Sequence, residues 1–264
     1  MALLLLPESS SAWPVADSEV FRPMEAEMAR GLGMRKQGFD PPYFLAYRLT
    51  DIRAMEVAAS FGAVTDDDVQ ESRVLYVEVR VGTRTLDNTD LGFQGWNVSA
   101  GNASDEIRTQ LWTLTDKAYK SAVSGYLEKK AKRATEFIAE PLDDFSVEVS
   151  TAFAGPVPET DLQGERGRLL ELLPRLSAVF REYPFIYESH ATARRQWSRR
   201  YLLTSEGTRI AAEGSHVPGV LRLSAMTRAP DGMRLDALAG FPYREWGALP
   251  SEGVLVEAVR RLAR

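Results

Sequence analysis

The 264-residue sequence contains no cysteine, and it contains no apolar stretch long enough to cross a membrane. Without cysteine the chain forms neither disulfides nor thiolate metal sites, so we expect a reducing, cytoplasmic location. A membrane span needs about 20 consecutive apolar residues. The leucine-rich start, MALLLLP, is far shorter, so we expect no membrane association and interpret it as a hydrophobic arm.

Histidine is also scarce, which limits metal binding and acid–base chemistry at neutral pH. His190 and His216 lie 26 residues apart and form no HExxH-type pair. A metal site made by Glu188 and both histidines is one hypothesis, and surface or hairpin histidines are the alternative that we favour. No glycine-rich phosphate loop and no GxSxG motif occurs. The sequence therefore predicts no catalytic residue, no metal ligand and no cofactor on this chain.

The charge balance argues against a general nucleic-acid-binding protein, because 37 acidic residues outnumber 32 basic ones and the net charge is −5. One local exception is ATARRQWSRRYLL, where Arg194, Arg195, Arg199 and Arg200 surround Trp197. Basic and aromatic residues in this arrangement bind single-stranded nucleic acids. The alternative, which we favour, is a strand with a packed tryptophan and exposed or paired arginines. We thus do not expect nucleic acid as a partner.

The clearest structural signal is the alternation of Val74–Val81, which predicts a strand with one aliphatic face. Strands at Tyr43–Leu49 and Ile52–Val64 precede it, so we expect a three-strand antiparallel meander. The acidic run Asp66–Asp68 is assigned to the turn between strands. Apolar spacing and capping residues predict two helices in this part of the chain. The first begins at Asp17 or Ser18, and the second runs from Ser104 to about Ala134.

A second set of elements follows a proline-rich connector at 141–160. Asp161 caps a helix, strands are predicted near 186–204, 208–213, 220–227 and 233–238, and a final helix begins near Pro250. We predict an α+β fold of two similar halves, each a helix plus an antiparallel three- to four-strand meander, with the sheets packed against long helices. Internal duplication and chance similarity both explain the likeness of the halves. The expected parts are an arm at 1–17, a first half at 18–140, a connector at 141–160 and a second half at 161–264.

The order of several segments resembles the N-terminal half of the TldD/PmbA family, metallopeptidases also called modulators of DNA gyrase. The segments are PYFLAYRLTD, AASFGAV, VEVRVGTRTLDNTD, LWTLTDKAYKSAV, and SEGTR followed by a DGM turn. The resemblance implies an α+β domain that binds extended peptide and helps to enclose a proteolytic chamber. In that family the hydrolytic zinc lies on an HExxxH helix of a separate C-terminal domain.

This sequence has no HExxxH motif, so the resemblance implies a non-catalytic module, with zinc expected on a partner chain or domain. The expected partners are a catalytic TldD/PmbA-like subunit or C-terminal domain, and a peptide substrate, in a hetero- or homo-oligomer. The chain is either a stand-alone half or an excised domain. An alternative function is a scaffold or assembly protein with the same fold and no role in proteolysis, for which the Leu3–Leu6 arm would be a contact surface.

Two motif loops are the candidate sites for substrate or partner binding. The plain alternative for both is turn chemistry, in which side chains bond their own backbone and glycine supplies a positive φ. The candidate residues are Asp87, Asn88 and Thr89 in the first loop, and Ser205, Glu206, Gly207, Thr208 and Arg209 in the second.

Overall fold

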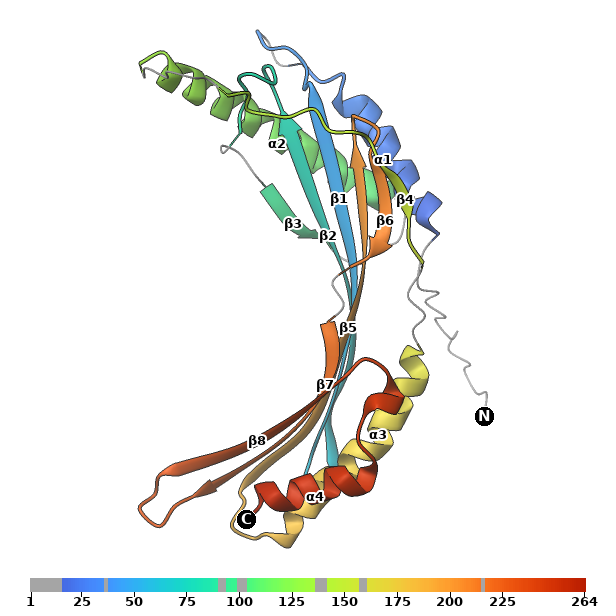
Figure 1. Cartoon of the computed structure of the whole chain (residues 1–264), viewed down its shortest axis with the longest axis vertical. Helices are drawn as coiled ribbons and strands as arrows, with labels where there is room; N and C mark the ends of the chain where they lie inside the picture. Colours follow the sequence, from blue (N-terminus) through green and yellow to red (C-terminus); the bar gives the residue numbers. More distant parts are fainter. Residues whose placement is uncertain are drawn as a thin grey trace, which may run out of the picture. The chain divides into compact units, whose positions relative to one another are not determined.

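The computed structural model is an α+β protein with a mostly antiparallel sheet, which confirms the predicted fold class (Figure 1). Of the arm expected at 1–17, only residues 16 and 17 belong to the described part of the chain, and Asp17 is the first residue of α1. None of the described helices combines the length and the apolar character that crossing a bilayer requires. The structure describes residues 16–35, 38–89, 94–98 (backbone only), 104–135, 142–156, 161–214 and 217–264.

The chain folds into two compact units that interleave along the sequence. We expected contiguous halves, 18–140 and 161–264. The units differ from them because three long strands, β1, β2 and β5, each contribute residues to both units. Unit 1 consists of Met1–Thr50, Arg73–Val157 and Arg200–Ala212, and unit 2 consists of Asp51–Ser72, Pro158–Arg199 and Glu213–Arg264.

Within the described residues, eight strands form one sheet in the order β3-β2-β1-β5-β6-β4, while β7 pairs with β5 and β8 pairs with β7. The β3–β2, β7–β5 and β8–β7 pairs are antiparallel, whereas β4 lies parallel to β6. The strands are β1 (Phe44–Ser60), β2 (Ala63–Arg80), β3 (Gln94–Val98), β4 (Ala152–Ala154), β5 (Glu188–Thr204), β6 (Arg209–Glu213), β7 (Val217–Arg228) and β8 (Arg234–Tyr243). The helices are α1 (Asp17–Gly31), α2 (Ser104–Arg133), α3 (Leu162–Ala178) and α4 (Glu252–Leu262), with 3-10 turns η1 (Val179–Glu182) and η2 (Trp246–Ala248).

The first two strands are longer than the sequence predicts. Strand β1 runs without interruption through the expected break between Tyr43–Leu49 and Ile52–Val64, so the predicted three-strand meander is a long hairpin of β1 and β2. Its reversal lies at Phe61 and Gly62, whose φ angles are 46° and 85°. Positive φ at both central residues gives a turn that matches the twist of paired strands. The assignment of Asp66–Asp68 to a turn is therefore wrong, because these residues lie in β2.

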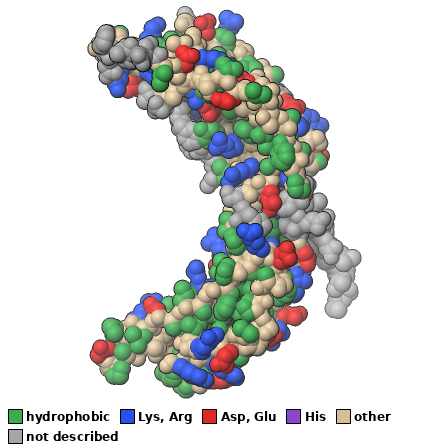
Figure 2. All heavy atoms as spheres, viewed as in Figure 1, with side chains coloured by type: hydrophobic (Ala, Val, Ile, Leu, Met, Phe, Trp, Pro, Cys, Tyr) green, Lys and Arg blue, Asp and Glu red, His purple; other side chains and the backbone are tan. Residues whose placement is uncertain are grey.

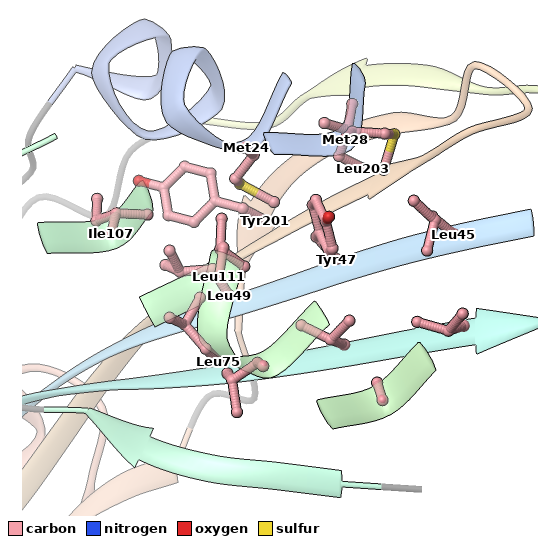
Figure 3. Close-up of a cluster of buried hydrophobic side chains, with 14 of the residues drawn as sticks. Met24, Met28, Leu45, Tyr47, Leu49, Leu75, Ile107, Leu111, Tyr201 and Leu203 are labelled. Atoms are coloured by element: carbon pink, nitrogen blue, oxygen red, sulfur yellow. The ribbon is translucent and has the colours of Figure 1, made fainter. Parts of the chain in front are cut away.

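The core of unit 1 lies between the sheet and the two helices α1 and α2 (Figure 3). The predicted aliphatic face of β2 is confirmed, since Leu75, Val77 and Val79 are all buried. Helix α2 buries its predicted apolar stripe against the same face. Each large side chain buried in this way stabilises the fold by about 1.5–3 kcal/mol. The side chains labelled in Figure 3 are Met24, Met28, Leu45, Tyr47, Leu49, Leu75, Ile107, Leu111, Tyr201 and Leu203.

The core of unit 2 lies between strands β5 and β7 and the helices α3 and α4. Asp161 caps α3 as predicted, because its Oδ1 accepts a hydrogen bond of 3.0 Å from the Gly164 N–H. The predicted strands and the final helix correspond to β5–β8 and α4. The connector at 141–160 contributes β4, which the sequence did not indicate.

Candidate functional site

The first candidate loop begins where β2 ends, at a tight turn that returns the chain alongside the strand. Gly82 has φ +95°, and a Cβ atom there would lie 2.5 Å from the Leu86 carbonyl oxygen. Thr83 N–H donates to that oxygen at 2.9 Å, and Gly82 forms an antiparallel bridge with Asp87. Only glycine fits this close approach without strain. The turn therefore reverses the chain, so that the loop lies beside the end of β2.

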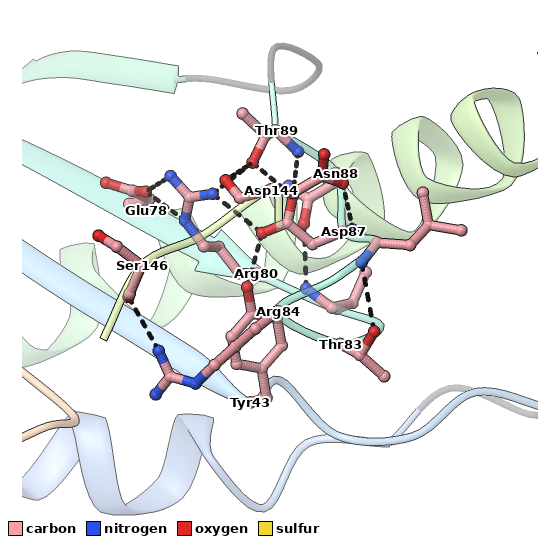
Figure 4. A network of polar contacts seen from close by, with 12 residues as sticks. Tyr43, Glu78, Arg80, Thr83, Arg84, Asp87, Asn88, Thr89, Asp144 and Ser146 are labelled. Atoms are coloured by element: carbon pink, nitrogen blue, oxygen red, sulfur yellow. Dashed lines mark hydrogen bonds and ion pairs between the residues drawn. The ribbon is translucent and has the colours of Figure 1, made fainter. Parts of the chain in front are cut away.

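The carboxylate of Asp87 is the centre of a polar cluster (Figure 4). It is fully buried, and its Oδ2 accepts hydrogen bonds from the Tyr43 hydroxyl at 2.6 Å and from Arg80 Nη1 at 2.9 Å. Its Oδ1 accepts from the Thr89 N–H at 2.6 Å and from the Thr89 hydroxyl. Four donors thus surround one carboxylate, which is the condition under which a buried charge is stable.

These contacts shift the pKa values of the groups involved. Burial would raise the pKa of Asp87, but hydrogen bonds from Thr89, Tyr43 and Arg80 outweigh burial and hold that pKa below its ordinary value. Burial raises the pKa of Tyr43 well above its ordinary value, and the hydrogen bond to Asp87 raises it further. At neutral pH the cluster therefore holds an ionised carboxylate and a neutral phenol.

Asn88 serves the backbone of β2 instead of the solvent. Its side-chain oxygen accepts a hydrogen bond of 3.0 Å from the Val81 N–H, and its amide nitrogen donates to the Val79 carbonyl at 3.0 Å. The Asn88 residue is only 5% exposed. An asparagine in this position replaces a neighbouring strand, because it satisfies two backbone groups that burial would otherwise leave unpaired.

A second carboxylate, Asp144, fixes the loop from the other side. Its Oδ2 accepts a hydrogen bond of 2.8 Å from the Asp87 N–H. Two cations from the basic end of α2 bind it, Lys129 at 2.8 Å and Arg133 at 2.9 Å. Cations at the end of a helix also interact favourably with its dipole. Through Asp144 these two cations anchor the segment after α2 to the loop.

The second candidate loop, Ser205–Arg209, is the turn between β5 and β6. Gly207 has φ +97° and its N–H donates to the Thr204 carbonyl at 3.1 Å, so the predicted need for positive φ is confirmed. Ser205 joins the turn to β1, because its hydroxyl accepts from the Leu45 N–H at 3.0 Å and its N–H donates to the Leu45 carbonyl at 2.8 Å. The Arg209 guanidinium lies 3.8 Å from the centre of the Phe21 ring.

The structure brings the two loops together within unit 1. Arg84, from the turn after β2, forms an ion pair with Glu206 and donates to the Ser146 carbonyl at 3.0 Å. Thr208 accepts a hydrogen bond of 3.3 Å from the Thr151 N–H. Both loops therefore contact the segment 142–156. This link cannot be predicted from the sequence, because no periodicity or motif indicates a contact with an irregular segment.

This arrangement is suited to holding backbone segments in place. Asp87 and Asn88 are buried, and the described structure uses their side chains for internal hydrogen bonds. Glu206, Thr208 and Arg209 also have partners in the protein, but they lie nearer the surface. A role of these loops in binding a substrate or partner stays a prediction.

The histidines and the arginine-rich motif have different surroundings. His190 Nε2 lies 3.0 Å from Glu188 Oε1, and His216 lies outside the described residues. Across the residues that the structure describes, no group of three or more possible ligands could hold a metal ion. Trp197 is 6% exposed and lies in the core of unit 2, so its ring is not available for stacking on a base.

Unit 2 contains a buried polar contact that was not predicted from the sequence. Arg195 forms an ion pair of 2.5 Å with Glu165 of α3, and the Tyr243 hydroxyl donates to the same carboxylate at 2.8 Å. Burial raises the pKa of Tyr243, and the nearby Glu165 carboxylate raises it further. The three residues are far apart in sequence, so only the fold reveals that they meet.

The sequence matches no protein-family model and no curated protein. Three solved structures share its fold. TldE from Thermococcus kodakarensis has a TM-score of 0.51 at 12% identity, covering 91% of this chain and 47% of that one. Proteins named as candidate modulators of DNA gyrase from Thermotoga maritima and Bacteroides thetaiotaomicron have TM-scores of 0.52 and 0.50, at 10% and 13% identity. They are covered over 47% and 49% of their lengths, and each match covers 92% of this chain. The chain spans about half the length of these proteins and has the fold that the TldD/PmbA resemblance predicted.

Proposed function

We propose that this chain is the non-catalytic, peptide-binding module of a TldD/PmbA-like zinc metallopeptidase, in which a partner chain or domain carries the zinc. The fold likeness to TldE supports the comparison, and the length of the match fits one module of a larger assembly. The observation that carries the peptide-binding role is the free edge of strand β8.

Strand β8 has a neighbour on one side only, within the described part of the sheet. It pairs with β7 over ten residues, from Arg234 to Tyr243. Among the described strands with one neighbour, β8 is the longest, because β3 has five residues and β4 has three. Hydrophobic side chains lie exposed on the β7–β8 hairpin (Figure 2), among them Met233 and Leu238, which is 62% exposed. A long exposed edge of this kind pairs readily with another strand.

The ladder itself shows which groups point outward. Next to the hairpin turn, the Ala229 N–H donates to the Met233 carbonyl at 2.8 Å. Hydrogen-bonded and non-hydrogen-bonded pairs alternate in an antiparallel ladder. The register therefore directs the backbone groups of every second β8 residue away from β7. These residues are Arg234, Asp236, Leu238, Gly240 and Pro242.

The position of Pro242 agrees with this assignment. Proline has no N–H to donate, so a strand accepts it where that group would face away from its partner. The free edge consequently offers four N–H donors and five carbonyl acceptors. An extended peptide that adds to this edge is held by its backbone, which allows many peptide sequences to bind.

The test removes one outward donor without changing the ladder. Leu238→Pro deletes the outward N–H, whereas the control Leu238→Ala loses the same side chain and keeps the donor. We expect Leu238→Pro to bind a fluorescein-labelled peptide of alternating valine and threonine about tenfold more weakly than Leu238→Ala, as the loss of one or two backbone bonds implies. Fluorescence anisotropy measures the affinity, and thermal melts check that both variants fold equally well.

Hydrogen exchange supplies an independent measurement. On peptide addition the outward amides of Asp236, Leu238 and Gly240 should exchange more slowly, because each then donates to the peptide backbone. Equal affinity of the two variants, or unchanged exchange at these amides, would contradict the proposal. A homo-oligomer that ignores peptide would instead support the scaffold alternative, for which the exposed Val147 and Val149 beside β4 offer a contact surface.

A further inference from the structure

Strand β7 carries an exposed arginine at the position directly opposite a glycine of the edge strand β8. Arg222 and Gly240 are direct partners in the β7–β8 ladder. Leu221 and Leu223 are buried in the core of unit 2, so Arg222 lies on the opposite face of the sheet, where it is exposed. A Cβ atom at Gly240 would have its nearest neighbour at 4.0 Å, so glycine is not required there by crowding.

The charge of Arg222 is not neutralised by the described part of the chain, where it has neither an ion pair nor a hydrogen bond. It lines a cleft of about 360 Å³ with Thr192, which is its partner in β5, and with Arg194. Arg194 lies 3.9 Å from Glu56, and its side chain is 70% exposed. The cleft thus holds two exposed guanidinium groups and one carboxylate, Glu56, which pairs with Arg194, so its remaining charge complements an anion.

Distances place Arg222 within reach of a peptide on β8. Neighbouring strands lie about 4.8 Å apart, so an added strand lies about 10 Å from β7. An extended arginine side chain covers roughly two thirds of that distance, and Gly240 leaves the path between them open. Because Gly240 directs its backbone outward, the peptide residue opposite it points to the same face as Arg222. A carboxylate on that residue meets the guanidinium.

We propose that the β8 edge selects peptides with an acidic residue opposite Gly240, and that Arg222 binds the carboxylate of this residue. The inference rests on the proposed peptide-binding function and adds a substrate class to it. The guanidinium fork binds carboxylates with two parallel hydrogen bonds. Arg222 is therefore a specificity-determining residue, and Gly240 is required because any side chain there fills the gap.

The experiment compares two labelled valine–threonine peptides that differ in one central residue, glutamate or glutamine. Because the peptides can slide along the edge, the single glutamate can reach the position opposite Gly240. In 50 mM salt we expect the wild-type chain to prefer glutamate about two- to fivefold, which is the effect of a partly exposed ion pair. Arg222→Gln should abolish this preference and leave the affinity for the glutamine peptide unchanged.

The control is Arg228→Gln, because Arg228 lies on the same strand and face but opposite Arg234 instead of a glycine. It should retain the preference, whereas Gly240→Val should lose it and still bind the glutamine peptide through the intact backbone. A preference that survives Arg222→Gln, or one that Arg228→Gln removes equally, would overturn the inference.

Two further outcomes separate this inference from its alternatives. If Leu238→Pro binds both peptides as well as wild type, the strand-addition function fails, whatever Arg222 does. If a thymidine oligonucleotide displaces the glutamate peptide from wild type but not from Arg222→Gln, the cleft binds nucleic-acid phosphates, and the peptide assignment is overturned. The full chain is used throughout, and thermal melts confirm that each variant is folded.

Discussion

Replacing Asp87 by asparagine tests whether the polar cluster stabilises unit 1. The substitution keeps the shape of the side chain and removes its charge, while four donors from Tyr43, Arg80 and Thr89 remain aimed at it. Hydrogen bonds to a charged group contribute about 1.5–3 kcal/mol each, against about 0.5–1.5 kcal/mol for neutral ones. Arg80 also binds Glu78, with a hydrogen bond of 2.7 Å, so it does not become an isolated buried charge. We expect Asp87→Asn to lower the free energy of unfolding by about 2–4 kcal/mol at pH 7.

The effect should depend on pH with a defined sign. The pKa of Asp87 in the native protein lies below its ordinary value. The stability that its charge contributes is therefore present above about pH 4, the unfolded pKa, and is lost as pH falls through the native pKa. The difference between wild type and Asp87→Asn should shrink as pH falls below about 4.

Urea unfolding followed by pulsed hydrogen exchange at residues 74–81 measures the stability of unit 1 specifically. Asp105→Asn is the control, because Asp105 is an exposed acid in the first turn of α2. Losing its charge should cost no more than about 1 kcal/mol. A loss for Asp87→Asn that is as small as this, or that is equal at pH 7 and pH 3, would refute the account of the cluster.

Two further substitutions probe the backbone of the same unit. Asn88→Ala leaves two buried backbone groups beside β2 unpaired and should lower the free energy of unfolding by about 2–4 kcal/mol in the same assay. Because asparagine does not titrate, the variant should be less stable than wild type at both pH 5 and pH 8. Gly82→Ala should lower the melting temperature more than Gly207→Ala. Both have positive φ, which costs about 1 kcal/mol, but only at Gly82 does a Cβ atom collide with a carbonyl oxygen. Equal melting temperatures would contradict this.

Local signals in the sequence were sufficient for the helices and for most strands. The spacing of apolar residues in α2 and the alternation at Val74–Val81 each predict an element with one apolar face, and in the structure that face is buried in both. The strand break near Thr50 was predicted wrongly because Asp51 is a poor strand former. In the structure Asp51 is buried within β1, so pairing with neighbouring strands outweighs its propensity.

The contacts that join distant segments could not be predicted in the same way. Arg84 pairs with Glu206 across more than a hundred residues, and Asp144 reaches Asp87 from an irregular segment. The gap at Gly240 depends on the register of β8 against β7. A single sequence records residue types and their periodicity, but pairing register is a property of two strands together.

The interleaving of the two units constrains how the chain acquires its structure. Unit 1 draws on Arg200–Ala212 to complete its sheet, so it cannot close while synthesis has reached only the middle of the sequence. In a nascent chain the edge of β1 that pairs with β5 stays open until β5 has left the ribosome. Such long-range closure slows folding, and it means that no single cut in the polypeptide releases either unit as an intact fragment.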